Sequence, residues 1–402
     1  MSLLIPTMNY DVTVIGAGPA GSAAAYFLAR GGLRVALLDK FDFPRDKTCG
    51  DGLTPRALKV LDAMGVLPQI ESLAFQCSAI TVRHSDAVSY RLELTHLGGL
   101  PHRILIVPRF FLDDTLRQHA VEAGAEFIPN AKVKSIGRLE NGRVCVHTED
   151  GSTIESACVI IATGSNTKLL REVGLLKQPP PSNLAARAYF ENVEGLDDTT
   201  LIFFDGIEMP GYGWVFPVAP GTANIGCGVF FDSSTAQPSK LRQLVQEHPY
   251  LRRILKNARQ VGPVRGFPLR TDFSPSYSGN NLALVVGEAL GLVNPMTGEG
   301  IDYALESAQL AAEAILNGWQ GESANPTIQR KYRHALARRF SYLMAISHLA
   351  QRLYFRDGTL ENLLIKAQQQ PHLRQALTEA CFGSARPSAM FTPRVLWEVF
   401  SR

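Results

Sequence analysis

Residues 10–39 read YDVTVIGAGPAGSAAAYFLARGGLRVALLD, and this stretch predicts the fold of the N-terminal part of the chain. Its first six residues are largely β-branched, which favours a short buried strand. Residues 22–30 are rich in alanine and contain no interior Gly or Pro, which favours a helix. The run RVALL at 34–38, apolar after its first residue, follows a Gly-Gly break. The stretch therefore predicts a strand–helix–strand unit.

A Gly-x-Gly-x-x-Gly pattern lies between the expected strand and helix. In such a pattern Gly16 makes a tight turn, Gly18 lets a pyrophosphate approach the backbone, and Gly21 lets the helix pack against the strand. The helix N-terminus directs free N–H groups at the phosphates. Asp39 ends the next strand, where a carboxylate accepts from a ribose hydroxyl and repels a 2′-phosphate. Glycines also mark ordinary turns, but the complete order of elements predicts a dinucleotide site for FAD or NAD rather than NADP.

The composition is that of a folded protein with two or more domains. Of its 402 residues 46% are hydrophobic and 19% charged, and the net charge of +3 is too small to indicate nucleic-acid binding. The six cysteines form neither a CxxC pair nor a metal-ligand spacing, which favours reduced thiols, a cytoplasmic setting and no metal site. Residues 1–9 are too short for a signal peptide. No apolar run is long enough to span a membrane, but a peripheral membrane contact is compatible with the sequence.

A long loop after the second strand contains the motif FPRDKTCGDG at residues 43–52. It leaves the sheet at the edge where ligands bind in open α/β folds. Pro55 suits the first turn of the helix that follows. Cys49 stands between the basic Arg45 and Lys47 and two glycines. Such a cysteine can approach a ligand closely, but a lone thiol is more often packed and inert. The spacing leaves both roles open.

The middle of the chain is expected to be rich in strands. Residues 110–123 form an amphipathic pattern that predicts a helix. Arg109 just before it could reach a cofactor phosphate or could be an ordinary solvated arginine. Residues 238–260 look helical. Strands are expected at 79–82, 88–94, 132–136, 144–148, 157–162 and within 185–231.

Three aromatic residues, Tyr212, Trp214 and Phe216, share one face of an expected strand, because side chains two residues apart point to the same side. Such a stripe is most often plain core. The neighbouring glycines leave room beside it, so it could also form the wall of an apolar ligand pocket.

A second glycine-rich loop, residues 287–300, follows the buried run 282–286 and precedes an expected helix over 301–315. Two such loops, far apart in the sequence, suggest one extended cofactor held from both sides. A helix N-terminus beside a flavin ring would favour the anionic reduced form. From residue 325 the chain reads as helical and basic. A solvated basic face is the simplest interpretation, and a surface for lipid headgroups is the alternative.

Together these motifs resemble the geranylgeranyl reductase family of FAD-dependent oxidoreductases, within the p-hydroxybenzoate hydroxylase fold group. The resemblance extends from about Tyr10 to Leu316. It is carried by the first glycine loop with Asp39, by FPRDKTCGDG, by PGYGWVFP at 210–217 and by the loop 287–300. It is closest to bacterial enzymes that saturate one isoprene unit of a menaquinone tail.

The resemblance implies a mixed α/β fold with discontinuous domains. A Rossmann-like FAD-binding domain would comprise residues 8–75, 103–185 and 265–320. An antiparallel-sheet substrate domain would comprise 76–102 and 186–264, and residues 321–402 would form a helical C-terminal segment.

The glycine patterns and the resemblance together give the expected site. Cys49 is expected beside the flavin ring as the catalytic candidate, and Tyr212, Trp214 and Phe216 are expected to line a prenyl tunnel. The expected FAD contacts are Gly16, Gly18, Ala20, Gly21, Asp39, Arg45, Cys49, Gly50, Arg109, Val133, Gly287, Glu288, Gly298, Gly300 and Ile301.

Two departures from the family pattern matter. The family usually has Gly-Asp where this chain has Gly287-Glu288, so the ribose contact must accommodate a longer side chain. Hydroxylases of this fold usually have Asp-Gly where Thr163-Gly164 stands here, which weakens the monooxygenase interpretation.

The function that the resemblance implies is reduction of carbon–carbon double bonds in an isoprenoid lipid by reduced FAD. The electron donor would be NAD(P)H or a reduced ferredoxin, and the sequence leaves both open, as it does the oligomeric state. A thiol at Cys49 could deliver the proton. Its basic neighbours Arg45 and Lys47 favour the thiolate, which suits ring positioning or proton relay better.

Two other functions are compatible with the same fold. One is an aromatic monooxygenase or flavin halogenase, but a halogenase would show Trp-x-Trp-x-Ile-Pro where this chain has Tyr212-x-Trp214-x-Phe216-Pro. The other is a non-catalytic prenyl-lipid carrier. Such carriers lose the flavin contacts, whereas this chain keeps both glycine loops.

Overall fold

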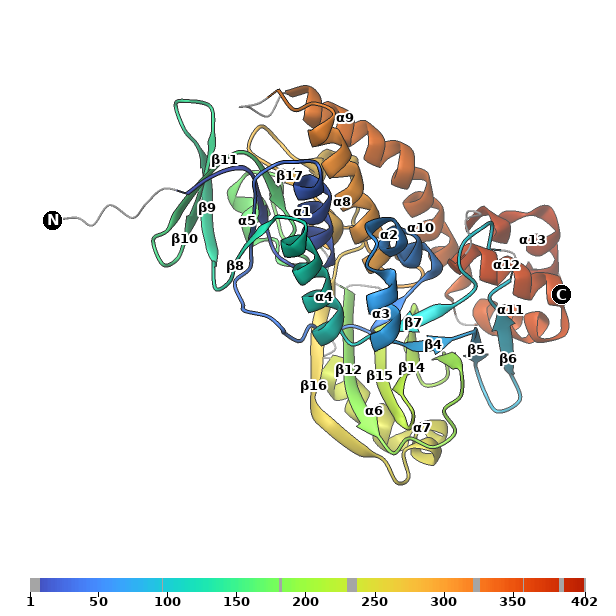
Figure 1. The fold of residues 1–402 in the computed structure, drawn as a ribbon. Coiled ribbons are helices and arrows are strands. Elements are labelled where there is room, and N and C mark those ends of the chain that lie inside the picture. Colours follow the sequence, from blue (N-terminus) through green and yellow to red (C-terminus); the bar gives the residue numbers. More distant parts are fainter. Residues whose placement is uncertain are drawn as a thin grey trace.

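The computed structural model describes residues 8–95, 97–180, 183–229, 237–320, 326–356, 358–382 and 387–400. Residues 1–7, most of the segment considered as a signal peptide, lie outside this part of the chain. Figure 1 shows a first sheet with helices α1, α4 and α8 beside it, a second sheet below, and the C-terminal helices at the opposite end from the N-terminus. The mixed α/β fold expected from the sequence is confirmed.

The first sheet contains the strand–helix–strand unit predicted from residues 10–39. Its strand order in the described chain is β8-β2-β1-β11-β10-β9, with β17 paired to β11. β1, β2, β11 and β17 are parallel, with Ile15 opposite Leu38 and Ile161, and Ile161 opposite Val285. Parallel strands end at one edge, so the loops that follow them leave the sheet together. The strands are β1 (Met8–Ile15), β2 (Val35–Leu38), β8 (Glu126–Ile128), β9 (Val133–Arg138), β10 (Val144–Thr148), β11 (Thr153–Ile161) and β17 (Leu284–Val285).

Helix α1 packs against α4 and α8 and connects the first sheet to the rest of the domain. Its alanine-rich face is fully buried at Ala23, Ala24 and Ala25, because small side chains let the helix approach its neighbours closely. The helices here are α1 (Pro19–Arg30), α2 (Pro55–Met64), α3 (Leu67–Leu73), α4 (Arg109–Glu122), α5 (Lys168–Glu172), α8 (Ile301–Leu316) and α9 (Pro326–Leu336).

The second sheet has the order β16-β12-β15-β14-β13-β5-β6. All neighbouring pairs are antiparallel except β13 and β5, which are parallel. A small sheet, β3-β7-β4, lies beside β14. The elements are β3 (Gly52–Leu53), β4 (Phe75–Cys77), β5 (Ala79–Arg83), β6 (Ser89–Glu93), β7 (Ile104–Ile106), β12 (Asn183–Glu191), β13 (Thr199–Phe203), β14 (Gly211–Ala219), β15 (Thr222–Val229), β16 (Arg259–Leu269), and the helices α6 (Gln237–Glu247) and α7 (Pro249–Ile254).

Residues 238–260 were expected to be helical, and this is wrong for the last residues of the segment. The helices stop at Ile254, and β16 begins at Arg259 and pairs with β12. The strand contains two glycines and two prolines and shows no clean alternation, so its neighbour rather than its own pattern defines it. β16 runs to Leu269, past the boundary expected at 264. The division into domains stays a proposal, which we now amend by placing all of β16 in the second domain.

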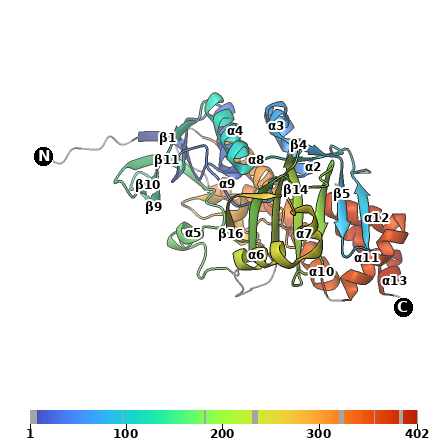
Figure 2. The ribbon, with the colours of Figure 1, turned by 90° about the horizontal axis from the view of Figure 1, so that it is seen from below.

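The C-terminal segment is helical and packs against the edge of the second sheet (Figure 2). Ile80 and Val82 of β5 share a core with Leu363 and Leu364 of α11. No helix in the described ranges is both long and apolar enough to cross a bilayer. The helices are α10 (Tyr342–Tyr354), which follows α9 through a π-helical turn at Ala337–Ser341, α11 (Thr359–Gln369), α12 (Pro371–Phe382) and α13 (Pro393–Phe400).

Candidate active site

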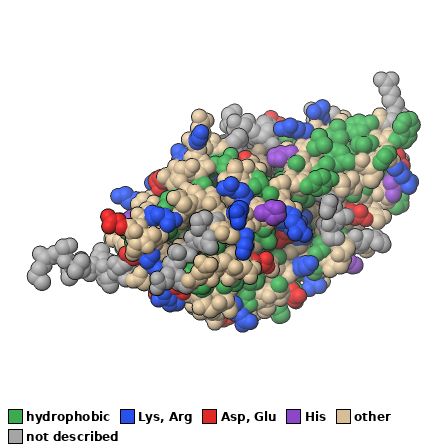
Figure 3. Space-filling view, turned by 90° about the horizontal axis from the view of Figure 1, so that it is seen from above, with side chains coloured by type: hydrophobic (Ala, Val, Ile, Leu, Met, Phe, Trp, Pro, Cys, Tyr) green, Lys and Arg blue, Asp and Glu red, His purple; other side chains and the backbone are tan. Residues whose placement is uncertain are grey.

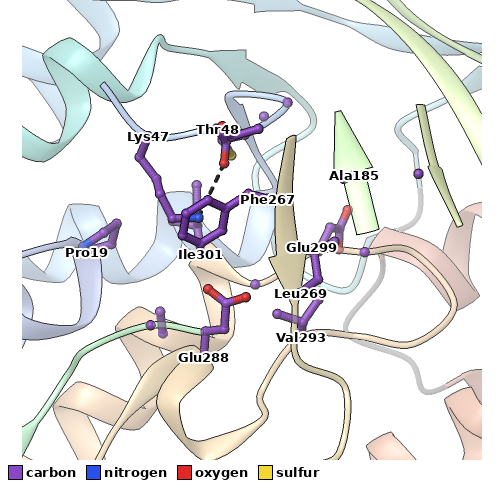
Figure 4. Close-up of a pocket in the computed structure, with 18 of the residues that line it drawn as sticks. Pro19, Lys47, Thr48, Ala185, Phe267, Leu269, Glu288, Val293, Glu299 and Ile301 are labelled. Atoms are coloured by element: carbon purple, nitrogen blue, oxygen red, sulfur yellow. Dashed lines mark hydrogen bonds between the residues drawn. The ribbon is translucent and has the colours of Figure 1, made fainter. Parts of the chain in front are cut away.

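A cavity of about 840 Å³ extends from the glycine loops of the first sheet, past β14, to helices α11 and α12. Figure 4 shows part of its wall, with side chains contributed by several separate segments. Every residue expected to contact FAD lines this cavity except Gly21 and Gly287, and Tyr212, Trp214 and Phe216 line it too. The structure therefore brings residues from both glycine loops, the Cys49 loop and the aromatic strand into one space.

The first glycine loop and the N-terminus of α1 form one end of the cavity. Gly16 has a φ of +105°, which glycine adopts without strain. A Cβ atom at Gly21 would overlap the carbonyl oxygen of Gly16, so Gly21 serves close packing. A Cβ atom at Gly18 would instead meet no neighbouring protein atom closer than 3.7 Å. The space above Gly18, at the positive end of the helix, is thus open to an anionic ligand.

Two arginine side chains border that space. The guanidinium nitrogens of Arg45 and Arg109 would lie 3.7 and 3.9 Å from a Cβ atom at Gly18. Both pair with the buried carboxylate of Asp113, at 3.0 Å for Arg45 and 2.7 Å for Arg109. Each guanidinium has five N–H donors, so both keep donors for phosphate oxygens. The side chain of Arg109 is only 9% exposed, so Arg109 is not the solvated surface arginine that its sequence position also allowed.

Asp39 lies buried at the end of β2, with its carboxylate fixed by the backbone. Its Oδ2 accepts from the Ala17 N–H at 2.8 Å, and its Oδ1 accepts from the Phe41 N–H at 3.0 Å. Arg45 approaches Oδ2 at 3.6 Å. A carboxylate has about four acceptor positions, so these contacts leave room for a ribose hydroxyl.

The second glycine loop approaches the first from β17. Gly287 has a φ of +66°, and a Cβ atom there would lie 2.9 Å from the Ala20 side chain, so this glycine serves close packing as well. Glu288 lines the cavity, and its Oε1 atom is buried without a hydrogen-bond partner in the described chain. Figure 4 shows its carboxylate directed toward the region where Lys47 and Phe267 lie. An orphaned buried acceptor at this position fits a hydroxyl group of a bound ligand.

Lys47 is a site residue whose position the sequence did not indicate. Its ammonium lies 3.8 Å from the centre of the Phe267 ring. Burial in the cavity lowers its pKa, although the charge of Glu288 acts in the opposite direction. Lys47 therefore lies in the cavity wall, where burial disfavours its charged form.

A buried polar network fixes the Cys49 loop to the second sheet. The side-chain amide of Asn224 donates to the Cys49 carbonyl at 2.8 Å and to Asp51 at 2.7 Å, and accepts from the Trp214 indole at 2.9 Å. Tyr189 also donates to Asp51 at 2.6 Å. Burial raises the pKa of Asp51 to about 6, although these hydrogen bonds favour its ionised form. The network holds the loop against the aromatic strand.

The aromatic stripe forms a wall of the cavity, as one of the two interpretations of its spacing proposed. Phe216 would lie 3.2 Å from a Cβ atom at Gly50, so the lack of a side chain at Gly50 leaves room for the Phe216 ring. A Cβ atom at Gly226 would overlap the Trp214 indole, which is 6% exposed. The Tyr212 hydroxyl donates to the Thr297 carbonyl. The Cys49 loop and the second glycine loop are therefore both in direct contact with the aromatic stripe.

Beyond the stripe the cavity is almost entirely apolar. Its wall there comes from β5, β6 and β7 on one side and from α11 and α12 on the other. No group of three or more His, Cys, Asp or Glu side chains in the described residues is arranged to hold a metal ion. The lining residues of this end include Ile80, Val82, Leu92, Ile104, Phe204, Leu360, Leu363, Leu364, Leu377, Ala380, Phe382 and Met390.

Several residues in or beside the cavity wall were missed by sequence reasoning, and only some had a signal. Asp113 stands four residues after Arg109 on one helix, a spacing that favours an ion pair. Glu299 lies within the recognised glycine-rich loop 287–300, but the sequence pattern assigned cofactor contacts only to other residues of that loop. Asn224 had no signal, since its partners are distant in sequence.

The chain matches the family model described as FAD binding domain over residues 9–341. The chain belongs to this family. It is 33% identical over 379 residues to a menaquinone reductase of Mycolicibacterium smegmatis, a match covering 89% of this chain and 90% of that protein. It is 30% identical over 320 residues to digeranylgeranylglycerophospholipid reductase 1 of Methanosphaera stadtmanae, covering 77% and 76%.

The fold agrees with this assignment. The structure aligns with a geranylgeranyl bacteriochlorophyll reductase-like protein of Thermoplasma acidophilum with a TM-score of 0.79 and 22% identity, covering 98% of this chain and 100% of that chain. These matches confirm the family resemblance carried by the four sequence motifs.

The residues present fit FAD. Open space above Gly18, the Arg45 and Arg109 donors and the α1 N-terminus suit the pyrophosphate, and Asp39 suits a ribose. The orphaned Oε1 of Glu288 offers a further acceptor from the second glycine loop. Residues at both ends of the nucleotide region can thus hold this FAD-binding protein's cofactor.

Gly18→Val is expected to abolish FAD binding while the protein stays folded. The added side chain would occupy the pyrophosphate position, but its first carbon meets no close protein atom. The measurement is flavin absorbance of the purified variant, with circular dichroism to check folding. Gly137→Ala, at a glycine with open space and an ordinary φ, is the control and should stay yellow. A yellow Gly18→Val protein would contradict this placement of the cofactor.

Proposed function

We propose that this protein reduces carbon–carbon double bonds in the prenyl chain of an isoprenoid lipid, with FAD as its cofactor. The observation that carries the proposal is the single cavity: its polar end suits a dinucleotide, and its other end is an apolar channel. A flexible prenyl chain matches such a channel in chemistry and shape. The relatives named menaquinone reductase and digeranylgeranylglycerophospholipid reductase support the same assignment.

The chemical problem is an alkene without activating groups. Reduced FAD, when bound, supplies the hydride. The chain's own residues must exclude water, hold the double bond in place and supply a proton to the other alkene carbon. Trp214 and Phe216 provide a flat, apolar wall next to the Cys49 loop. We therefore assign substrate positioning to this wall.

Cys49 is proposed to position the flavin ring or to relay a proton. Its backbone is fixed by Asn224, and its side chain lies close enough to Arg109 to raise the pKa of that guanidinium, together with Asp113. Arg45, expected to act on the thiol, is instead directed to Asp39 and Asp113. The electron donor that reduces the FAD, NAD(P)H or a reduced ferredoxin, is not needed in the assay below, because the enzyme is first reduced chemically.

The direct test is anaerobic oxidation of chemically reduced, FAD-loaded enzyme by a prenyl lipid. We expect flavin absorbance to return on addition of a menaquinone with an unsaturated tail or of a geranylgeranyl lipid. Mass spectrometry should show a gain of two hydrogens for each bond reduced. Oxidation that requires oxygen and yields a hydroxylated product, or that requires halide, would instead favour the monooxygenase or halogenase. Protein that holds lipid but no flavin would favour the carrier.

Phe216→Ala is expected to slow lipid-dependent oxidation of the reduced enzyme by about tenfold or more, because a displaced double bond loses its alignment. FAD content should stay near that of the wild type, since the ring faces the channel. Val218→Ala is the matched control, because Val218 follows on the same strand and packs against the same core as Phe216 but does not line the cavity. If Phe216→Ala loses FAD or unfolds while Val218→Ala does not, the stripe is core and the tunnel assignment is wrong.

Cys49→Ala is expected to retain FAD but to slow the same oxidation step, and Cys49→Ser should recover part of the loss. Serine keeps a similar shape and an O–H group but is a poorer acid. Stopped-flow absorbance gives the rate constants, and equilibrium dialysis gives FAD affinity. A Cys49→Ala enzyme that reoxidises as fast as the wild type would reduce this thiol to a packing role.

We also propose a peripheral contact with a membrane, from which such a lipid would enter. Figure 3, viewed from above, shows Lys, Arg and His side chains next to a hydrophobic patch. Exposed Arg330, Lys331 and Arg338 lie on and just after α9, and Trp397 and Phe400 of α13 are 75% and 47% exposed. Basic side chains attract anionic headgroups, and exposed aromatic groups enter the interface.

Trp397→Ser should weaken binding to vesicles that contain anionic lipid by about tenfold, because one large apolar side chain no longer leaves water. Binding is measured by co-sedimentation, and salt should weaken it further. Val261→Ser, an exposed apolar position on β16, is the control and should bind as the wild type does. Equal binding by both variants would remove α13 from the contact.

A further inference from the structure

Glu299 lies in the wall of the cavity, in the turn that precedes α8. Figure 4 shows it well separated from Lys47 and Glu288, on the side of the cavity where Ala185 of β12 lies. The Tyr212 hydroxyl donates to the carbonyl of Thr297, two residues before Glu299, and all three residues line the cavity, so Glu299 lies near the aromatic wall. Glu299 is therefore close to the wall to which we assign substrate positioning.

The carboxyl group of Glu299 lacks a counter-ion of its own. Its Oε2 atom is buried and makes no hydrogen bond within the described chain. The nearby cation, Arg56, pairs with Asp302 at 3.3 Å and donates to the Tyr303 hydroxyl at 2.9 Å. Asp302 is further bonded by its own loop, with the Tyr303 N–H at 2.9 Å. Two acids thus share one arginine, and Asp302 is the one that holds it.

This arrangement favours the protonated form of Glu299. Burial raises the pKa of Glu299 well above its ordinary value, and the neighbouring charge of Asp302 raises it further, while Arg56 acts in the opposite direction. The other titratable groups that face it are Tyr212, Tyr303 and Cys381, and burial raises the pKa of each, so they stay neutral. In its protonated form, Glu299 places an O–H donor in the wall of the cavity.

We propose that Glu299 is the acid that protonates the alkene. The inference rests on the proposed function. In this step one π bond is lost and two C–H bonds form: one carbon takes the hydride supplied by the reduced cofactor, and the other takes the proton of the Glu299 carboxyl. Glu299 is left as a carboxylate beside Asp302. Because two adjacent buried carboxylates are unfavourable, Glu299 takes up a proton from water before the next turnover.

The assignment gives Cys49 and Glu299 separate tasks. Cys49 lies on the loop that Asn224 holds, with its side chain near Arg109, whereas Glu299 lies in the turn that precedes α8. A residue that orients the cofactor and a residue that protonates the substrate should respond differently to substitution.

The test compares Glu299→Gln with Glu306→Gln in the FAD-loaded enzyme. Glutamine keeps the shape of glutamate, but its amide group cannot act as an acid at neutral pH. Glu306 is a matched control, since it lies on α8 shortly after Glu299, is largely buried and pairs with Arg339 at 2.6 Å, but does not line the cavity. Glu299→Gln should bind FAD and prenyl lipid normally and slow anaerobic, lipid-dependent oxidation by about a hundredfold or more. Glu306→Gln should keep the wild-type rate.

The pH dependence gives a second readout. The wild-type rate constant should fall as pH rises through the pKa of Glu299, because only the protonated form reacts. Glu299→Gln should lose this dependence, and Glu299→Asp should restore part of the rate. In the oxidised holoenzyme, the infrared band of a protonated carboxyl group should be present in the wild type at neutral pH and absent in Glu299→Gln.

The outcomes separate the two proposals. A wild-type enzyme that prenyl lipids do not oxidise overturns the proposed function, whatever the infrared spectra show. A wild type that is oxidised, with Glu299→Gln equally fast, overturns the role of Glu299 and leaves the function intact. An infrared difference spectrum without the carboxyl band shows Glu299 to be ionised and also overturns the inference.

Discussion

The parallel pairing of β1, β11 and β17 is the constraint on which the rest of the site depends. Ile161 of β11 lies between Ile15 and Val285, the residues at the ends of the two strands that precede the glycine loops. The loops therefore emerge at one edge although they come from opposite parts of the sequence. A shift of one residue along either strand would move its loop by about 3.3 Å and separate the two halves of the nucleotide region.

The second requirement is that the two sheets keep a fixed relation across the cavity. Asn224 of β15 achieves this by bonding the Cys49 carbonyl, Asp51 and Trp214 at once. Each bond adds only about 1 kcal/mol net, but an unmet buried partner costs more than that. Because all partners must be satisfied together, the network selects one position of the loop against the aromatic wall. It contributes geometric precision more than stability.

The strand–helix–strand unit, both glycine loops and the aromatic stripe were predictable because each rests on local pattern: apolar periodicity, glycine spacing and an acid at a strand end. β16 was not, because its pairing with β12 overrides a sequence full of Gly and Pro. The partners of Arg109 and Cys49 were only partly accessible. Asp113 is four residues from Arg109 on one helix, whereas Asn224 is 175 residues from Cys49, and no local signal links them.

The parts of the cavity wall are also expected to form at different times during folding. Thr54 and Asp302, which meet beside the channel, are 248 residues apart, and α11 and α12 close the apolar end last. Contacts of such long range form slowly, because loop-closure entropy must be overcome before they stabilise anything. The first glycine loop belongs to a local strand–helix–strand unit, whereas the apolar side of β5 is covered only when α11 packs on it. A chain that lacks its C-terminal helices therefore exposes apolar surface of the channel to water, which favours aggregation.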